Sequence, residues 1–211
     1  MSGLRQKQKA HRHDRILEAA AELFREFGYE AVKMEAIAAA AEVSIGTIYN
    51  YYQNKGDLLV AIVALEVHEV LKAGDRVIAQ PPQSAEKAID TLVGGYAGHS
   101  LHYLSKEMWR QAFAISTQQP ASPFGETFME LDTALANQIC SLIEKLQAVK
   151  LLSPEADARS LGEIIFNNTN MNFITFVKTQ DMSTPELRAT LRRQHRALIR
   201  RYKPSRIDSG L

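Results

Sequence analysis

The chain has one cysteine and lacks any long hydrophobic segment. With Cys140 alone among 211 residues, an intramolecular disulfide is excluded, which fits a reducing compartment. The longest apolar run, residues 58–65, is far shorter than the ~20 residues that span a bilayer. No apolar signal-peptide core follows the basic start. We therefore expect a cytoplasmic protein without membrane contact.

The chain also lacks a strong overall charge, since its formal net charge of +1 is not typical of a nucleic-acid binder. The charge is uneven, however. Residues 57–187 carry 16 Asp and Glu against 9 Lys and Arg, whereas residues 188–211 carry 8 Lys and Arg against 1 Asp. Residues 1–15 are also basic. Such an arm is consistent with phosphate contact, and equally with a solvated terminus.

Strands are not expected, because no stretch alternates with period two. Apolar residues instead repeat at helical spacing through residues 16–27, and Gly28 is well placed to end that helix. Two short helices follow at residues 34–40 and 45–51. The remaining chain repeats the helical pattern, so the sequence predicts an all-α protein of about nine helices.

Capping residues and prolines mark where these helices begin and end. A Ser, Thr or Asn side chain caps free N–H groups, and proline suits the first helical turn. Pro81 and Pro82 separate the fourth helix from the fifth. The predicted starts are at Ser44, Asn54, Ser84, Ser105, Ser122-Pro123, Ser153-Pro154 and Thr184-Pro185.

A long helix followed by two short ones around a tight turn is the arrangement of a helix-turn-helix. Val43, Ile48 and Tyr52 would face inward, onto Ile37, Ala38 and a stripe with Leu23 and Phe27. A packed helical hairpin with surface tyrosines would give the same pattern. The residues left facing outward are Ile45, Gly46, Thr47, Tyr49, Asn50 and Tyr51.

Residues from about 12 to 62 resemble the DNA-binding domain of the tetracycline-repressor (TetR-type) family. The resemblance rests on a set of residues at fixed spacing rather than on a single dipeptide. The set comprises Ile16, Ala19, Ala20, Leu23, Phe24, Gly28, Tyr29, Ile37, Ala38, Ala41, Val43, Ser44, Gly46, Thr47, Ile48, Tyr49, Tyr51, Tyr52, Asn54, Lys55 and Leu58.

The resemblance implies a surface that enters the DNA major groove. Thr47, Tyr49 and Lys55 match phosphate contacts in the family, whereas Ile45 and Tyr51 match positions near base edges. Isoleucine has no hydrogen bond to give, so its natural target is a thymine methyl group. The candidate DNA-binding residues are Lys33, Glu35, Ser44, Ile45, Gly46, Thr47, Tyr49, Asn50, Tyr51 and Lys55.

Three residues depart from the family pattern. Glu42 stands where glycine is usual in the turn, so either the turn differs or a strain of ~1 kcal/mol is tolerated. Lys33 replaces a capping threonine and offers a cation to a phosphate. Glu35 lies on the outward face of the second helix, where it would either accept from cytosine N4 or repel the backbone.

We predict a DNA-binding domain at residues 1–56, with a basic disordered arm at 1–11, and a larger helical domain at 57–205 before a tail at 206–211. The resemblance implies that the larger domain, joined through the fourth helix, binds a ligand and dimerises through the last two long helices. Burial within one subunit is as good an explanation for each apolar residue there. Candidate interface residues are Leu161, Ile165, Leu187, Leu191, Leu198 and Tyr202.

The ligand site is predicted from aromatic, histidine and asparagine residues in the larger domain. Asparagines interrupt an apolar helix at residues 164–173, where they would line a cavity or form a hydrogen-bonded dimer seam. The histidines and aromatics fit a pocket wall or ordinary core. Candidate pocket residues are His99, His102, Tyr103, Trp109, Phe113, Phe128, Asn168, Met171 and Asn172.

Four arginines recur every four residues in the last helix, at Arg188, Arg192, Arg196 and Arg200. This row would contact nucleic acid, line an anionic-ligand site, or form a solvated face that the acidic middle segment partly neutralises.

Together these patterns predict a homodimeric transcriptional regulator that binds double-stranded DNA at a palindromic operator, as a repressor released by an unknown small molecule. The alternatives are an activator of the same fold, an adaptor that binds a protein through the tyrosines, or a helical enzyme. No nucleophile–base pair, phosphate loop or metal motif is present, so no catalysis, cofactor or metal is expected.

Overall fold

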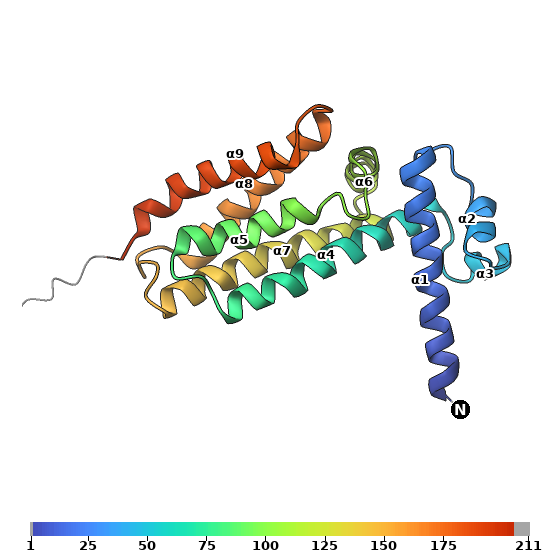
Figure 1. Ribbon diagram of the computed structural model, residues 1–211, viewed down its shortest axis with the longest axis horizontal. Helices are drawn as coiled ribbons and strands as arrows, with labels where there is room; N and C mark the ends of the chain where they lie inside the picture. The colour runs from blue at the N-terminus through green and yellow to red at the C-terminus, as the bar shows by residue number, and fades with distance from the viewer. Residues whose placement is uncertain (1, 205–211) are drawn as a thin grey trace, which may run out of the picture. The chain divides into compact units, whose positions relative to one another are not determined.

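The computed structural model describes residues 2–204, with side chains from Lys7 onward. The predicted tail at 206–211 lies outside the described residues. Nine α-helices and one 3-10 turn make up the described chain, without strands, so the all-α prediction is confirmed (Figure 1). The elements are α1 (Ser2–Phe27), α2 (Met34–Ala40), α3 (Ile45–Tyr49), α4 (Lys55–Ala79), α5 (Ala85–His99), α6 (Lys106–Gln118), α7 (Pro123–Ala148), α8 (Ala158–Lys178), α9 (Thr184–Ile199) and η1 (Arg200–Tyr202).

The N-terminal arm is helical, which corrects the prediction of disorder at residues 1–11. Helix α1 begins at Ser2. Its first turns are rich in Leu, Arg, Lys, Gln and Ala, which have the highest helix propensities. The Arg12 Nε also donates to the Gln8 carbonyl one turn earlier, at 3.2 Å. Basic charge and a terminal position favour disorder, but the high helix propensity of these residues favours the helix that forms here.

Most predicted helix starts agree with the caps observed, but α8 starts later than predicted. Asp157 caps α8 by accepting from the Ser160 amide at 2.7 Å. The segment before it is held by α7, since the Gln147 side chain donates to the carbonyls of Ser153 and Ala156, at 3.0 and 2.7 Å. These bonds hold the segment in a turn. Ser183 rather than Thr184 caps α9.

The described chain forms two compact units, which differ from the predicted division at residue 56. The first unit contains Met1–Glu66 and Leu101–Glu130, and the second contains Val67–Ser100 and Leu131–Leu211. Helices α4 and α7 each contribute to both units. Helix α6 belongs to the first unit together with the helix-turn-helix, although its residues fall within the predicted larger domain.

The first unit is built around one face of α1. Ile16, Ala20 and Phe24 are fully buried there, as their i, i+4, i+8 spacing requires. Phe27 is 57% exposed, so its predicted place in the core is wrong. The helix ends at this residue, and the Gly28 amide closes the last turn on the Phe24 carbonyl at 3.0 Å.

Helix α6 is held within the first unit by aromatic ring contacts and by a hydrogen bond from α1 to the segment before it. Trp109, Phe113 and Phe128 form a chain of ring contacts, with centroids 6.1 and 5.6 Å apart. Before α6, the Arg25 side chain donates to the His102 carbonyl at 2.8 Å. These contacts explain why a segment far along the chain joins the N-terminal helices.

The second unit joins α4, α5 and α7 through one buried amide. The Gln138 Nε2 donates to the Leu71 carbonyl and to Asp75, both at 2.7 Å, while the Tyr96 hydroxyl donates to its Oε1 at 2.6 Å. Burial raises the pKa of the Tyr96 phenol well above its ordinary value. Helix α9 then packs against α5 and α8.

Among residues 2–204, no helix combines the length and apolar character required to cross a bilayer. In the same range, no group of three or more His, Cys, Asp or Glu side chains could hold a metal ion.

Candidate nucleic-acid interface

The turn between α2 and α3 adopts the strained conformation that the sequence left in doubt. Glu42 has a φ of 51°, a region that costs a residue with a Cβ atom roughly 1 kcal/mol. The Arg15 guanidinium of α1 donates to the Ala41 carbonyl and, at 3.1 Å, to the Glu42 carbonyl. The Val43 amide then donates to the Ala38 carbonyl at 3.0 Å. Contacts from α1 therefore hold the turn without glycine.

Helix α3 is anchored by a cap at its start and one buried face. The Ser44 Oγ accepts from the Thr47 amide at 3.1 Å and lies 2.8 Å from the Thr47 hydroxyl. Ile48 is fully buried, and Tyr52 after the helix is 7% exposed. Although α3 has only five residues, its orientation is therefore fixed by packing.

The opposite face of α3 carries exposed side chains. Ile45 is 37% and Tyr49 50% exposed, and Gly46 and Asn50 are exposed beside them. The side chains of Tyr49 and Asn50 have no hydrogen-bond partner among the described residues. The structure thus leaves this part of the predicted DNA surface available to another molecule.

Two predicted contacts are engaged within the protein, which the sequence did not reveal. The Lys55 Nζ donates to the carbonyls of Tyr29 and Glu30, at 2.9 and 3.0 Å, and lies 4.8 Å from the centre of the Tyr29 ring. The Tyr51 hydroxyl donates to the Lys9 carbonyl at 3.3 Å. Lys55 thus joins the start of α4 to the loop after α1, and Tyr51 joins the segment after α3 to α1. Their phosphate and base contacts stay predictions.

The candidate residues before the turn are solvent-exposed. Lys33 precedes α2 and makes no side-chain cap, as its identity predicted. Glu35 follows in the first turn of α2, and both side chains are exposed. Neither has an ion-pair partner among the residues described.

Residues 16–62, which include this helix-turn-helix, match the family model described as "Bacterial regulatory proteins, tetR family". The chain therefore carries the DNA-binding domain of a TetR-type transcriptional regulator. It is 25% identical over 175 residues to the HTH-type transcriptional repressor KstR of Rhodococcus jostii, across 82% of this chain and 76% of the relative.

Solved structures with low sequence identity show the same fold. A TetR transcription regulator from Haloarcula marismortui, 18% identical, aligns with a TM-score of 0.72 over 92% of this chain and 99% of its own. The repressor FadR of Thermus thermophilus, solved with lauroyl-CoA and 21% identical, aligns with a TM-score of 0.64 over 94% and 98%.

The predicted pocket residues of this regulator are divided between the two units. In the first unit, Trp109 and Phe128 are 6% and 7% exposed and pack in the aromatic chain with Phe113. The His102 ring contacts the Tyr103 ring edge-on, with centroids 4.5 Å apart. These residues form core and surface contacts, and a ligand pocket among them stays a prediction.

In the second unit, His99 and Asn172 have protein partners, whereas the Asn168 Oδ1 is buried without a hydrogen-bond partner among the described residues. His99 Nε2 lies 3.2 Å from Glu69. Asn172 donates to the Asn168 carbonyl and, across to α9, to Gln194 at 2.9 Å. Met171 is 62% exposed, and its place in a ligand pocket stays a prediction. The asparagine cluster therefore joins α8 to α9 at Asn172.

The predicted dimer residues are mostly buried inside the second unit, which corrects their assignment. Leu161, Ile165, Leu187 and Leu191 are at most 3% exposed, because α8 and α9 pack on each other and α9 packs on α5. Leu198 and Tyr202 are half-buried. Ile164, which the apolar pattern of the last two long helices also offers as an interface residue, is 53% exposed on α8, as is Met171 at 62%.

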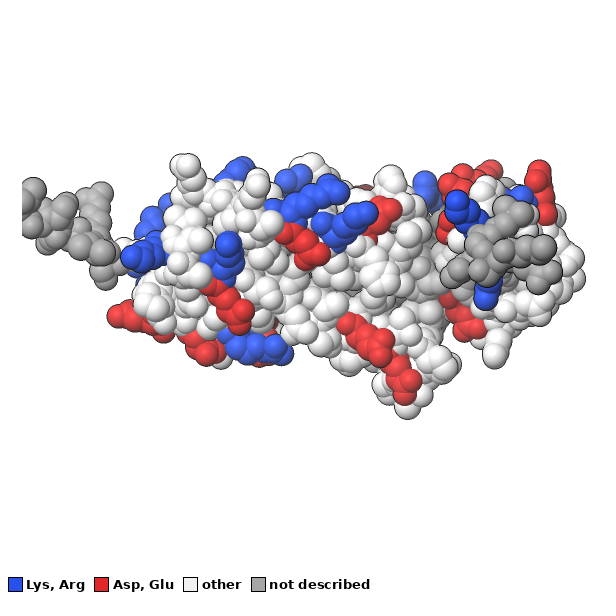
Figure 2. All heavy atoms as spheres, turned by 90° about the horizontal axis from the view of Figure 1, so that it is seen from below, with Lys and Arg blue, Asp and Glu red and all other residues white. Residues whose placement is uncertain are grey.

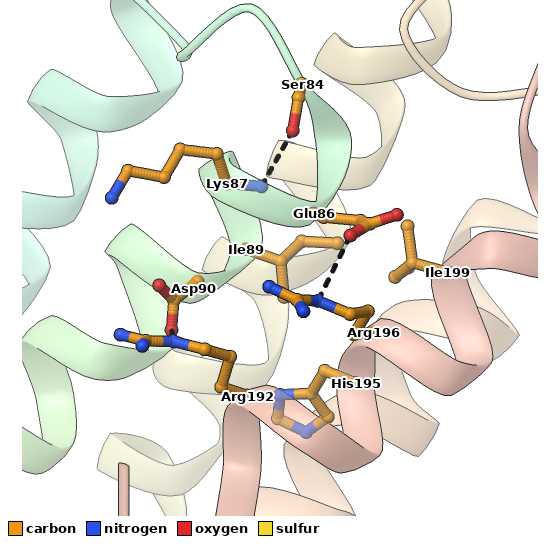
Figure 3. A pocket seen from close by; sticks show the side chains of 9 residues that line it. All are labelled: Ser84, Glu86, Lys87, Ile89, Asp90, Arg192, His195, Arg196 and Ile199. Atoms are coloured by element: carbon orange, nitrogen blue, oxygen red, sulfur yellow. Dashed lines mark hydrogen bonds and ion pairs between the residues drawn. The ribbon is translucent and has the colours of Figure 1, made fainter. Parts of the chain in front are cut away.

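The arginine row of the regulator forms ion pairs along the seam between α5 and α9. Figure 3 shows Arg192 turned toward Asp90, at 2.9 Å, and Arg196 toward Glu86, at 3.2 Å. Glu86 also lies 3.4 Å from Arg200 and from Lys203. On the face drawn in Figure 2, basic side chains likewise lie beside acidic ones. Three arginines of the row therefore lie beside carboxylates of α5, two of them sharing Glu86 with Lys203.

Proposed function

We propose that this regulator is a cytoplasmic, dimeric repressor that binds a palindromic double-stranded operator and is released by a small-molecule ligand. One observation carries the DNA contact: α3 buries Ile48 and exposes Ile45 and Tyr49 on its other side. A helix fixed in this way presents free side chains to a major groove. One such helix reads only a few base pairs, so two-fold symmetry is needed for a specific site.

Each exposed side chain suits a particular part of the duplex. Ile45 would contact a thymine methyl group, whereas the hydroxyls of Tyr49 and Thr47 would donate to phosphate oxygens. Lys33, exposed before α2, would add a cation beside the backbone. Gly46 leaves room for close approach.

The dimer contact is proposed on the outward face of α8. Ile164 and Met171 are seven residues apart and therefore lie on one face of the helix. Replacing both with glutamate should give a monomer in analytical ultracentrifugation and should weaken operator binding. Met129→Glu, at a residue 66% exposed on α7, is the control and should remain dimeric. A dimer that survives the double substitution would place the contact elsewhere.

The DNA proposal is tested by selecting binding sites from random duplexes with the purified protein. We expect an inverted repeat with half-site centres about one helical turn (~10 bp) or somewhat more apart. Recovery of no motif, with no binding even at low salt where phosphate contacts are strongest, would overturn it. In vitro transcription from a promoter that carries the selected site then separates repression from activation.

The first ligands to test for release are acyl-CoA thioesters, because the Thermus thermophilus FadR structure contains lauroyl-CoA. A ligand releases DNA only if it binds the DNA-incompetent state more tightly. Addition of lauroyl-CoA should therefore lower operator affinity in fluorescence anisotropy, whereas free CoA serves as the control. Unchanged affinity with acyl-CoA of several chain lengths would exclude this ligand class.

A further inference from the structure

The first arginine of the row, Arg188, is the exception to the ion pairs between α5 and α9. It lies one turn before Arg192 but has no hydrogen-bond or ion-pair partner among the described residues. Its neighbours in the row pair with Asp90 and Glu86, which are four residues apart on α5. The next position at this spacing is Gly94. A glycine therefore stands where a carboxylate would complete the pattern.

The glycines of α5 create the space in which the Arg188 guanidinium lies. A Cβ atom on Gly94 would meet the Arg188 Nη2 at 3.3 Å, and one on Gly98 would meet Nη1 at 3.7 Å. A Cβ atom on Gly95 would meet nothing within 4 Å. Each glycine in a helix interior costs roughly 1 kcal/mol relative to alanine. This stretch of α5 thus lacks the side chains that would otherwise cover its backbone.

Arg188 and these glycines line a groove between α4, α5 and α9 with a volume of about 590 Å³. Its two carboxylates, Glu69 and Asp90, lie 3.2 Å from His99 and 2.9 Å from Arg192. Lys87 also lines the groove, and its ammonium has no side-chain partner among the described residues. With histidine counted as neutral, the three cations Lys87, Arg188 and Arg192 exceed the two carboxylates, so the groove carries a net positive charge.

We propose that this groove binds a small organic anion whose carboxylate or phosphate pairs with Arg188, as the carboxylates of α5 pair with the later arginines of the row. A guanidinium presents two parallel donors to either group, and the open position at Gly95 lets the anion approach the helix backbone. The groove has the size of small-molecule sites, roughly 300–1,000 Å³. Val70, Val77 and Leu92 also line it and would contact the apolar part of the ligand. The proposal does not depend on the operator, because the site is formed within the second unit.

The test is an NMR titration of the arginine Nε–Hε resonances of the full chain at constant ionic strength. Sodium pyrophosphate and sodium octanoate are added in separate experiments, and the Arg188 signal is assigned by its loss in Arg188→Gln. We expect a saturable shift of this signal with at least one of the two anions. The anion that binds more tightly identifies the site as one for phosphates or for carboxylates.

Two further variants distinguish the groove from general attraction to a basic surface. Arg188→Gln should weaken binding about tenfold, as expected for loss of a charge-assisted pair. Arg193→Gln, on the same helix but outside the groove, should change affinity less than about twofold. Gly95→Leu should fill the groove and weaken binding about tenfold without lowering the melting temperature, since a Cβ atom fits there.

Three results would overturn the proposal. The first is the absence of a saturable Arg188 shift with either anion. The second is an equal effect of Arg188→Gln and Arg193→Gln, and the third is undiminished binding in Gly95→Leu. No DNA is present in these experiments, so their outcome is separate from that of the operator selection.

Discussion

In the sequence, the residues of α3 and the arginine row of α9 both suggest nucleic-acid contact. In the structure, the outward face of α3 is exposed, whereas the arginines of α9 form ion pairs with α5. Tyr49 on α3 is half exposed and has no hydrogen-bond partner among the described residues. Arg192 and Arg196 on α9 are within 3.2 Å of carboxylates on α5. The uncharged face of α3 is left without protein partners, whereas most of the basic row lies beside carboxylates. A run of arginines is therefore informative only once its partners are known.

The seam shows how a row of charges can serve packing. Glu86 is close to three cations, which allows α9 to lie against α5 although both present charged residues there. Each pair is modest because the arginines remain 48–59% exposed and exposed pairs contribute little. Their main consequence is the alignment of the two helices, which also positions Arg188.

The two sides of α3 provide the test with the largest expected effect. Ile48→Ala removes a fully buried side chain and should lower the free energy of unfolding by about 4 kcal/mol. Tyr49→Ala should leave stability within about 0.5 kcal/mol but weaken operator binding about tenfold. Urea denaturation and fluorescence anisotropy measure the two quantities. Strong destabilisation by Tyr49→Ala would show that its face is structural and that the comparison with the seam is wrong.

Buried titratable groups in the second unit give a pH test. Burial raises the pKa of Asp132 from 3.8 to about 6. Between these pH values the folded state binds a proton that the unfolded state has lost, so the free energy of unfolding falls as the pH rises. Burial lowers the pKa of His195 in the seam from 6.5 to about 4, although Asp90 opposes the shift. Stability linked to His195 therefore falls as pH drops below 6.5. In the native chain the two effects oppose each other.

Single substitutions should separate these opposing slopes. As the pH rises from 4 to 7, the free energy of unfolding of Asp132→Asn should increase by about 3 kcal/mol relative to that of the native chain. Over the same rise in pH, the free energy of unfolding of His195→Gln should decrease by a similar amount relative to that of the native chain. Urea unfolding at several pH values measures both differences. Parallel profiles for the native chain and both variants would show that neither group titrates differently on folding.

The smallest effect is expected from the seam carboxylate. Glu86→Gln leaves Arg196, Arg200 and Lys203 without their shared partner and should destabilise the protein by about 1 kcal/mol, less at high salt. Operator affinity of the folded protein should be unchanged. A fall in operator affinity without a fall in stability would instead link the seam to DNA binding.

Local signals in the sequence predicted much of the fold because they depend on neighbouring residues. Ser44, Asn54 and Ser84 cap helices as expected, since a cap needs only a side-chain oxygen and the next turn. Ile48 was correctly assigned to the core by helical spacing. Phe27 shares the helical spacing of the buried residues but is 57% exposed, because spacing does not show whether another segment covers the last turn.

Contacts between distant segments could not be predicted in this way. Lys55 resembles a phosphate ligand in sequence, but its ammonium is held by carbonyls of residues 29 and 30. From the sequence, Leu187 fits a dimer interface as well as it fits the core of one subunit. Only the packing of α9 shows that it is buried within the subunit. The same holds for the predicted pocket, whose residues belong to two units.

The sequence by itself determined the helices of this protein, the helix-turn-helix and its family, because caps, periodicity and fixed spacing act over a few residues. Only the tertiary structure decided which charges are neutralised and which remain free. Arg188 and Arg192 are equivalent by spacing along α9, yet one faces Gly94 and the other pairs with Asp90. Their difference comes from the helix opposite, because the charge that an arginine meets is set by packing between segments almost one hundred residues apart.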